Sequence, residues 1–355
     1  MGKPKQLSCF LLALLLWSCS PDSKYPYAIN DFRKELQPAL SQLVTQGFLL
    51  HAESALKDAT DKELEQLGNS EHPLLRAAAF RVMLDRKSFD HSKIMMDHLD
   101  DTALVFIDAG ESGIWFKTVS DDIIYNTRWK SEADKNKTVE AVITKHNYLR
   151  SAYTILEKLG PQERYYPYIK EMARRENPSF GASDYPWIDD NAEYALYGLA
   201  KFKKREDIPF IKYQLMENIR RLSTLNCKLM REYPDSSYMQ VLENFYRRQF
   251  YRKFCREQFP LSEDFINTLA VYKNSGSAAI LDSILNKKNH CNCFIEPGWL
   301  EDEVAHAVWE NPCAAYDKLR KQVAQRIKEL EKLSLPVENY PAPDLINKRE
   351  ENIRW

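Results

Sequence analysis

Glycine is scarce in this sequence, at 10 residues in 355. Turn-rich β-sandwiches and propellers need glycine at many tight turns, so this scarcity argues against both classes. Beyond the N-terminal region, no apolar run approaches the roughly 18 residues of a membrane-spanning helix. The motifs of common enzyme classes are also missing, because we find no phosphate-binding loop and no GxSxG, HExxH or CxxCH pattern. These absences favour a helical, globular chain without a recognisable catalytic motif.

The sequence also lacks a net charge of any size, because its basic and acidic side chains are nearly equal in number. The chain has 50 basic and 51 acidic side chains, whereas proteins that bind nucleic acids concentrate positive charge on one face. We therefore expect no nucleic-acid partner. Hydrophobic residues make up 44% of the chain, which is enough for a core, and the length allows one elongated or two compact domains.

The N-terminus combines a positive start with a short apolar run. Lys3 and Lys5 precede the apolar residues 10–17, and a cysteine follows at position 19. The run is much shorter than the roughly 20 residues that cross a bilayer, so it is typical of a secretory signal rather than a membrane span.

The end of this signal resembles the cleavage site of bacterial lipoproteins. That family has leucine three places before an invariant cysteine, with small residues between them. Leu16, Ser18 and Cys19 match this pattern, whereas Trp17 is bulky for its position. The resemblance implies a signal peptide over 1–18, acyl chains such as palmitate on Cys19, and a lipid-anchored tether over 19–27. The alternative is an ordinary cleaved signal with an unrelated cysteine.

Residues 191–222 have the pattern of two helices that fold back on each other. A polar turn at 203–206 separates them, Asp207 can cap the second helix, and Pro209 falls in its first turn, where proline is tolerated. Apolar residues recur on one face of each helix at helical spacing: Ala192, Ala195, Leu196, Leu199 and Phe202, then Ile208, Ile211, Leu215, Ile219 and Leu222. Two such short helices need similar neighbours to bury their shared face.

Related pairs are predicted over 73–99 and 148–173. Three matches relate the pairs: residues 75–78 to 149–152 at an offset of 74, Ala152 to Ala195 at 43, and residues 168–170 to 210–212 at 42. Offsets near 40 fall within the range of two-helix HEAT-type units, and 74 is close to two of them. The skipped unit corresponds to the irregular residues 102–145.

The remaining elements are predicted from the same periodicity and from turn signals. Further helices are expected over 26–50, 61–67, 236–259, 265–270, 279–285, 299–308 and 312–330, a turn over 107–113, a strand or degenerate helix at 114–116, and an exposed loop over 131–137. The long, charged final helix suits the end of a repeat array, which needs a polar outer side.

This pattern resembles the HEAT-like α-solenoid family of bacterial envelope lipoproteins. The resemblance rests on residues 75–99, 149–173 and 192–215. It implies an all-α fold, a right-handed α-solenoid of HEAT-like helix pairs over 28–335 with a long C-terminal capping helix, followed by an extended tail at 336–355. Helical repeats of this kind serve as scaffolds or binding surfaces, and the fold alone does not fix a function. TPR-like or unclassified helical packing is the alternative.

Five cysteines follow the N-terminal region, and an odd number cannot all pair within one chain. The sharpest cluster is His290, Cys291 and Cys293, with His306 and Cys313 further on. Its CxC spacing differs from the paired CxxC of zinc sites, so zinc is the weaker interpretation and we expect no metal or other cofactor. A disulfide of Cys291 or Cys293 with Cys313 is favoured because exported proteins form such bonds, and free thiols are the third interpretation.

Three further patterns bear on binding. Tyr185 and Trp187 lie in an irregular insert and are candidates for ligand contact, since exposed rings stack on sugars; filling a groove between helices is the structural alternative. Aromatic and basic residues alternate over 246–253, which favours an amphipathic helix with a buried aromatic face over a surface for an anionic partner. Glu303 and His306 share a helical face, but the second copy that a di-iron bundle needs is missing.

We therefore predict a non-enzymatic, membrane-anchored envelope lipoprotein that binds a protein partner through its helical surface. Ser20 differs from the aspartate that retains some lipoproteins in the inner membrane, so the outer membrane is favoured. The alternative is capture of a carbohydrate or nutrient, the role of the helical SusD-like family, which this chain resembles only in being helical, lipid-anchored and rich in aromatics. An enzyme with an unrecognised site is the third hypothesis.

Overall fold

The structure is a computed structural model that describes residues 26–47, 49, 52–108, 114–127, 129, 131–175, 190–217, 222–250, 263–286 and 299–333. Over these residues the chain is all-α apart from one two-stranded hairpin, as the sequence predicts. It divides into two compact units, with the division between Ala152 and Tyr153. None of the described helices is both long enough and apolar enough to cross a bilayer.

The first unit is built around one buried helix, α5 (Pro73–Asp85), which begins with proline as predicted. Ten of its residues are buried, and it packs against most of the surrounding elements. The others in chain order are η1 (Ile29–Asp31), α2 (Gln37–Gln46), α3 (Ala52–Ala55), α4 (Asp61–Leu67), α6 (His91–Asp97), β1 (Leu104–Asp108), β2 (Ile114–Thr118), α7 (Val119–Asn126) and α8 (Glu132–Lys145).

Strands β1 and β2 form an antiparallel hairpin in which Val105 pairs with Lys117 and Phe106 with Phe116. The sequence predicts a strand or degenerate helix only at 114–116 and a turn from residue 107, so β1 is an addition and residues 107 and 108 belong to it. A short run of β-branched and aromatic residues, Val105 to Ile107, explains the strand. Val105 is buried, whereas Leu104 and Phe106 are about half exposed.

Two predicted boundaries in this unit are wrong. The helix expected over 26–50 is regular only in α2, where Pro38 occupies the first turn; proline has no N–H for the carbonyl of Lys34, so a longer helix is interrupted there. The loop expected over 131–137 is the start of α8. Ser131 accepts a hydrogen bond from the N–H of Asp134, and this cap begins a helix whose first turns are polar because they face solvent.

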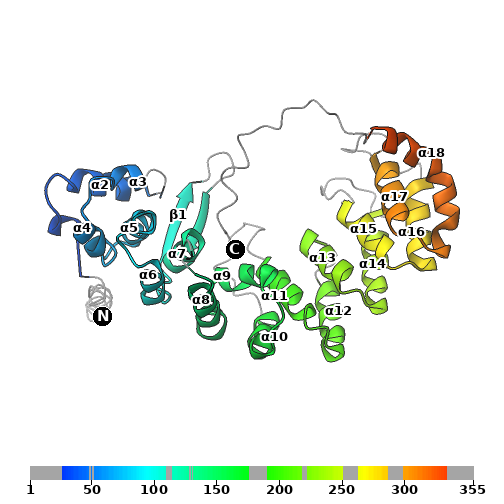
Figure 1. Cartoon of the computed structure of the whole chain (residues 1–355), viewed down its shortest axis with the longest axis horizontal. Helices are drawn as coiled ribbons and strands as arrows, with labels where there is room; N and C mark the ends of the chain where they lie inside the picture. The colour runs from blue at the N-terminus through cyan, green and yellow to red at the C-terminus, as the bar shows by residue number, and fades with distance from the viewer. Residues whose placement is uncertain are drawn as a thin grey trace, which may run out of the picture. The chain divides into compact units, whose positions relative to one another are not determined.

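The second unit consists of helices arranged in two rows. Helices α11, α13, α15 and α17 contact one another in that order, while α12, α14 and α16 form the other row (Figure 1). Its elements are α9 (Arg150–Lys158), η3 (Glu163–Tyr165), α10 (Tyr166–Arg174), α11 (Asp190–Ala200), η5 (Arg205–Asp207), α12 (Ile208–Glu217), α13 (Thr224–Glu232), η6 (Ser236–Tyr238), α14 (Met239–Phe250), α15 (Glu263–Val271), α16 (Ser275–Asn286), α17 (Trp299–Glu310), η7 (Ala314–Tyr316) and α18 (Asp317–Leu333).

The second helix of each pair starts with a three-residue turn, here called the entry turn. The entry turns are residues 163–165, 205–207, 236–238, 275–277 and 314–316; the fourth is the first turn of α16 and the others are 3₁₀ turns. The third residue of every entry turn is buried: Tyr165, Asp207, Tyr238, Ser277 and Tyr316. This shared burial aligns the pairs independently of the apolar pattern.

Helix α13 is an element that the sequence analysis does not predict. It begins at the cap Ser223, which accepts a hydrogen bond from the N–H of Asn226, and it buries Cys227, Leu229 and Met230. It lies in a short unit, because only 31 positions separate the entry turns at Arg205 and Ser236. The last predicted helix is confirmed as α18, whose inner face buries Leu319, Val323 and Ile327.

Close packing of α9 against α11 gives a first prediction. A Cβ atom at Gly198 would lie 3.1 Å from the Cβ of Leu156, so Gly198→Val is expected to lower the free energy of unfolding by about 1–3 kcal/mol through overpacking. Gly160→Ala is the control, since a Cβ there meets nothing within 4 Å. Urea unfolding followed by circular dichroism measures both; equal stability of the two variants would contradict the packing.

Candidate functional site

Most of the site residues predicted from sequence lie outside the described residues. This applies to Cys19, Tyr185, Trp187, Cys291 and Cys293. Cys313 is half-buried and is a free thiol in the structure. The lipid attachment, the ligand contacts and the disulfide therefore stay predictions.

Two other patterns can be placed. In α14, Phe245 and Tyr246 are buried while Arg247 and Arg248 are exposed, which confirms the amphipathic interpretation for this part of the segment. Glu303 is half-buried on α17, and burial raises the pKa of its carboxyl. No group of three or more potential ligands is close enough to hold a metal ion within the described part of the chain.

Cys227 is the buried thiol of α13. Burial raises the pKa of this thiol to about 12, so it is neutral at physiological pH. Reactive cysteines carry a thiolate, usually next to positive charge and open to solvent. The position of Cys227 is therefore that of a packing residue.

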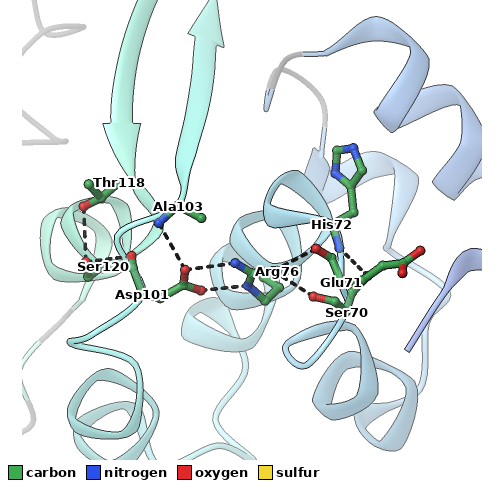
Figure 2. Close-up of polar contacts among 8 residues, drawn as sticks. All are labelled: Ser70, Glu71, His72, Arg76, Asp101, Ala103, Thr118 and Ser120. Carbon is green, nitrogen blue, oxygen red and sulfur yellow. Dashed lines mark hydrogen bonds and ion pairs between the residues drawn. The ribbon is translucent and has the colours of Figure 1, made fainter. Parts of the chain in front are cut away.

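A buried ion pair between Arg76 and Asp101 lies at the centre of the first unit (Figure 2). Nε and Nη2 of Arg76 donate to the two carboxylate oxygens of Asp101 at 2.7 and 2.9 Å, and Nη1 donates to the carbonyl oxygens of Ser70 and Glu71 at 2.8 and 3.2 Å. Both side chains are at most 3% exposed. The pair links α5 to the chain segments on either side of it.

The same cluster continues into the hairpin and α7. The hydroxyl and N–H of Ser120 both donate to the carbonyl oxygen of Asp101, at 2.9 and 3.0 Å, and Asp101 also accepts from the N–H of Ala103 (Figure 2). Every one of these contacts is made by the chain itself. The cluster is thus a structural joint, because its buried charges are already used in satisfying each other.

In the second unit, polar side chains of one pair satisfy the helix ends of the pair before it. Nζ of Lys201 lies 2.6–3.0 Å from the carbonyl oxygens of Leu156 and Glu157, in the last turn of α9, and of Leu159, just after it. These carbonyls have no partner within their own helix. Burial lowers the pKa of Lys201 to about 8, so the ammonium is the predominant form at neutral pH and can donate to all three.

Tyr316 performs the same task at the end of α15. Its hydroxyl lies 3.0 and 3.2 Å from the carbonyl oxygens of Ala270 and Leu269, accepts from the N–H of Lys273 at 3.1 Å, and lies 2.7 Å from the hydroxyl of Ser277. These four groups form a polar nest at the end of α15, and the phenol fills it completely.

The corresponding nest at the end of α11 is not filled in this way. Leu199, Ala200, Lys203 and Asp207 precede their counterparts in the α15 nest by 70 positions each, and Lys203 and Lys273 share the left-handed backbone conformation, with φ of 54° and 52°. The counterpart of Tyr316 is Tyr238. Although Tyr238 is only 2% exposed, its hydroxyl has no hydrogen-bond partner among the residues that the structure describes.

A pocket of about 340 Å³ occupies this place. Leu199, Ile211 and Tyr238 form its buried part, and Lys203, Lys204, Arg205 and Tyr233 are among the more exposed residues that line it. Burial raises the pKa of the Tyr238 phenol, and the carboxylates of Asp235 and Asp207 raise it further, so the hydroxyl keeps its proton. The pocket combines an apolar floor with an unused donor, as binding sites for small groups do.

A second hollow, of about 670 Å³, lies between α6 and α8 of the first unit. Three basic and three acidic side chains line it, and Lys93 and Asp97 pair with each other at 2.7 Å. The only buried residue in its lining is Phe89, so it offers no buried side-chain hydrogen-bond donor. The smaller pocket, which has the phenol of Tyr238 among its buried residues, is therefore the better candidate site.

Sequence reasoning misses this pocket because one of its walls is formed by the end of α13 and the turn after it, and α13 is not predicted. Two signals for α13 are present in the sequence: the cap Ser223 and the apolar positions 225, 227, 229 and 230. The absence of a described partner for Tyr238 has no sequence signal, because apolar periodicity reports burial and not hydrogen bonding.

The joint at Arg76 predicts a large loss of stability on substitution. Arg76→Met leaves the buried carboxylate of Asp101 without its partner, so we expect the free energy of unfolding to fall by about 3–5 kcal/mol. Lys93→Met removes an exposed ion pair and is expected to leave the unfolding midpoint unchanged. Thermal unfolding compares the two, and a similar effect of both substitutions would show that the buried pair has no special role.

Two matched tyrosines give a third prediction. Tyr316→Phe removes a hydroxyl that four groups use and should lower the free energy of unfolding by about 1–3 kcal/mol. Tyr238→Phe removes a hydroxyl without a described partner, so no loss is expected. Urea unfolding curves measure both, and an equal loss would mean that Tyr238 is hydrogen-bonded in solution.

The comparisons with known proteins add no relative to this account. No protein-family model matches the chain, and no curated protein or solved structure is significantly similar to it. The fold and the candidate site rest on the sequence and the geometry described above.

Proposed function

We propose that this chain is a lipid-anchored scaffold of the bacterial envelope that binds a protein partner through a right-handed α-solenoid of HEAT-like helix pairs. The observation that carries this proposal is the order of helix contacts in the second unit. First helices contact first helices, α11 to α13 to α15 to α17, and second helices contact second helices, α12 to α14 to α16. Repeat proteins stack their units in this way, each against its nearest neighbours.

The spacing of the entry turns supports a repeat. Successive entry turns begin 42, 31, 39 and 39 positions apart. Three of these intervals are close to the roughly 40 residues of a HEAT unit. A stack of this kind exposes the turns between helices along its edge, and such edges and faces are the surfaces that repeat proteins use in binding.

The chemistry of the described residues favours binding over catalysis. The buried side chains of Arg76 and Asp101 pair with each other in a structural joint, and the thiol of Cys227 is neutral, so neither has the state of a reactive group. By contrast, the turn between α11 and α12 carries exposed cations, Lys203 and Arg205, that pair with no acidic side chain in the described part of the chain. Cations of this kind are available to a partner.

The membrane anchor is proposed because the N-terminal signal that ends at Cys19 resembles that of lipoproteins. The outer membrane is the favoured location. An acyl-bearing cysteine would hold the helical body close to the bilayer. Capture of a glycan through Tyr185 and Trp187 is the alternative from the sequence. Those residues lie outside the described ranges, and no described contact favours glycans over a protein partner.

Capture from the native envelope tests the proposal. Residues 24–355, immobilised without the signal and lipid, are expected to retain a specific envelope protein with micromolar or tighter affinity, about −8 kcal/mol. The same chain immobilised after unfolding in urea is the control, because a folded surface is required. Retention of only those proteins that also bind the unfolded control would overturn the proposal.

A further inference from the structure

The unfilled nest at the end of α11 is open to a hydrogen-bonding group from outside the chain. At the equivalent end of α15, the hydroxyl of Tyr316 contacts two carbonyls, one N–H and one hydroxyl. At α11, Tyr238 is equally buried but has no partner among the described residues, and a pocket of about 340 Å³ is present. The oxygen of this phenol is open to the pocket and not sealed in the core, so a group from outside the chain can accept its hydrogen bond.

The two nests also differ in the length of the chain between entry turns. From Ser275 to Ala314, which leads to the filled nest, there are 39 positions; from Arg205 to Ser236, which leads to the open one, there are 31. Helix α13 has nine residues, three fewer than α17 in the corresponding place. The two tyrosines therefore reach their nests over chain segments of different length.

The acidic side chains of this pocket are already engaged. Glu232 accepts from the hydroxyl of Tyr197 at 2.6 Å, and Asp235 accepts from the N–H of Ser237 at 2.9 Å. Asp207, which lies close to the Tyr238 phenol, pairs with Lys170 at 2.8 Å and accepts from Tyr166 at 2.8 Å. Part of the hydrogen-bonding capacity of each carboxylate is therefore already used by the protein.

The cationic side chains of the pocket are less engaged. Lys204 pairs with Glu163 at 2.8 Å and lies over the ring of Tyr166. Nζ of Lys203 lies 5.7 Å from the centre of the Tyr233 ring, and this lysine has no ion pair within the described residues. The guanidinium of Arg205 likewise has no ion pair or hydrogen bond there. The groups of the site that remain free to bind a ligand are therefore hydrogen-bond donors: the cations of Lys203 and Arg205 and the phenol of Tyr238.

The charge of the pocket lining limits the class of ligand that the pocket can bind. Three basic and two acidic side chains line the pocket, Lys203, Lys204 and Arg205 against Glu232 and Asp235, which leaves one positive charge. A group with a single negative charge and two acceptor atoms balances this lining, whereas a dianion such as phosphate would leave an excess of negative charge. A carboxylate meets both conditions and forms strong, charge-assisted hydrogen bonds with arginine and lysine.

We propose that the pocket between α11–α12 and α13–α14 binds a carboxylate, the side chain of an aspartate or glutamate in a segment of the partner protein. The phenol of Tyr238 donates from the floor, and Lys203 and Arg205 hold the charge at the mouth. The identification of the carboxylate as a partner's side chain rests on the proposed scaffold function. The binding of a carboxylate at this place rests only on the pocket itself.

The test uses the full chain, purified in mild detergent and labelled at the isoleucine methyl groups, because Ile208 and Ile211 line the pocket. A capped pentapeptide with one central glutamate among alanines is titrated at low salt, and the same peptide with glutamine is the control. We expect the methyl signals of Ile208 and Ile211 to shift with the glutamate peptide and not with the glutamine peptide.

Substitutions assign the effect to named residues. Lys203→Ala combined with Arg205→Ala should weaken the glutamate peptide about tenfold or more, and Tyr238→Phe should weaken it several-fold, as expected for loss of charge-assisted and neutral hydrogen bonds. Lys273→Ala, at the matching position beside the filled nest, is the control and should leave the affinity unchanged.

Each contrary result overturns a defined part of the proposal. Equal shifts with both peptides, or equal affinity in the double variant, would overturn carboxylate binding. Acetate that binds as tightly as the peptide would identify a free organic acid in place of a partner segment. Methyl shifts with maltose alone would assign the pocket to a neutral glycan. Failure to capture an envelope protein leaves this titration valid, so the two proposals fail separately.

Discussion

The end of an α-helix leaves its last carbonyl oxygens without a partner, and this constraint organises the second unit. Its helices are short, so such ends are frequent. The pair that follows supplies the donors: Lys201 reaches the end of α9, Tyr272 donates to the carbonyl of Met230 on α13, and Tyr316 donates at the end of α15. Each pair therefore donates hydrogen bonds to helix ends of the pair before it. Polar contacts as well as apolar packing thus determine the order of the pairs.

A second kind of joint stabilises the first unit. In this unit a β-hairpin is inserted among helices. The Arg76–Asp101 pair holds the hairpin against α5, because the two side chains and the backbone of Asp101 contact segments before and after this helix. Buried ion pairs contribute little when compared with apolar residues of the same volume, but they are costly to break. Such a pair fixes the arrangement of the elements that it touches more than it adds to their stability.

Much of the fold could be predicted from the sequence, for identifiable reasons. The pairs at 73–97 and 190–217 have clear apolar periodicity, proline in the first turn of a helix, and polar turns between helices, and these local signals agree with one another. The prediction was wrong where a signal was short or ambiguous. The capped start of α8 is polar enough to resemble a loop, β1 is only five residues long, and α13 is short and less apolar on average than α11 and α12.

The candidate site could not be predicted, although all of its residues are visible in the sequence. Lys203, Lys204 and Arg205 are identifiable as a polar turn, and Tyr238 as an apolar position of the next helix. Their function as a group depends on which hydroxyl reaches which carbonyl oxygen between positions that are far apart in the chain, such as 203 and 238. Sequence periodicity reports which face of a helix is inward; it contains no information about whether a buried hydroxyl finds a partner.

The short interval between Arg205 and Ser236 has a consequence for how such a molecule can change over time. In most proteins a new recognition site requires added loops or new side chains. Here the hollow exists where the chain is shorter, while the tyrosine that fills the matching nest elsewhere is retained. A stack of helix pairs can thus carry a site at one junction without a change in the apolar faces that hold neighbouring pairs together.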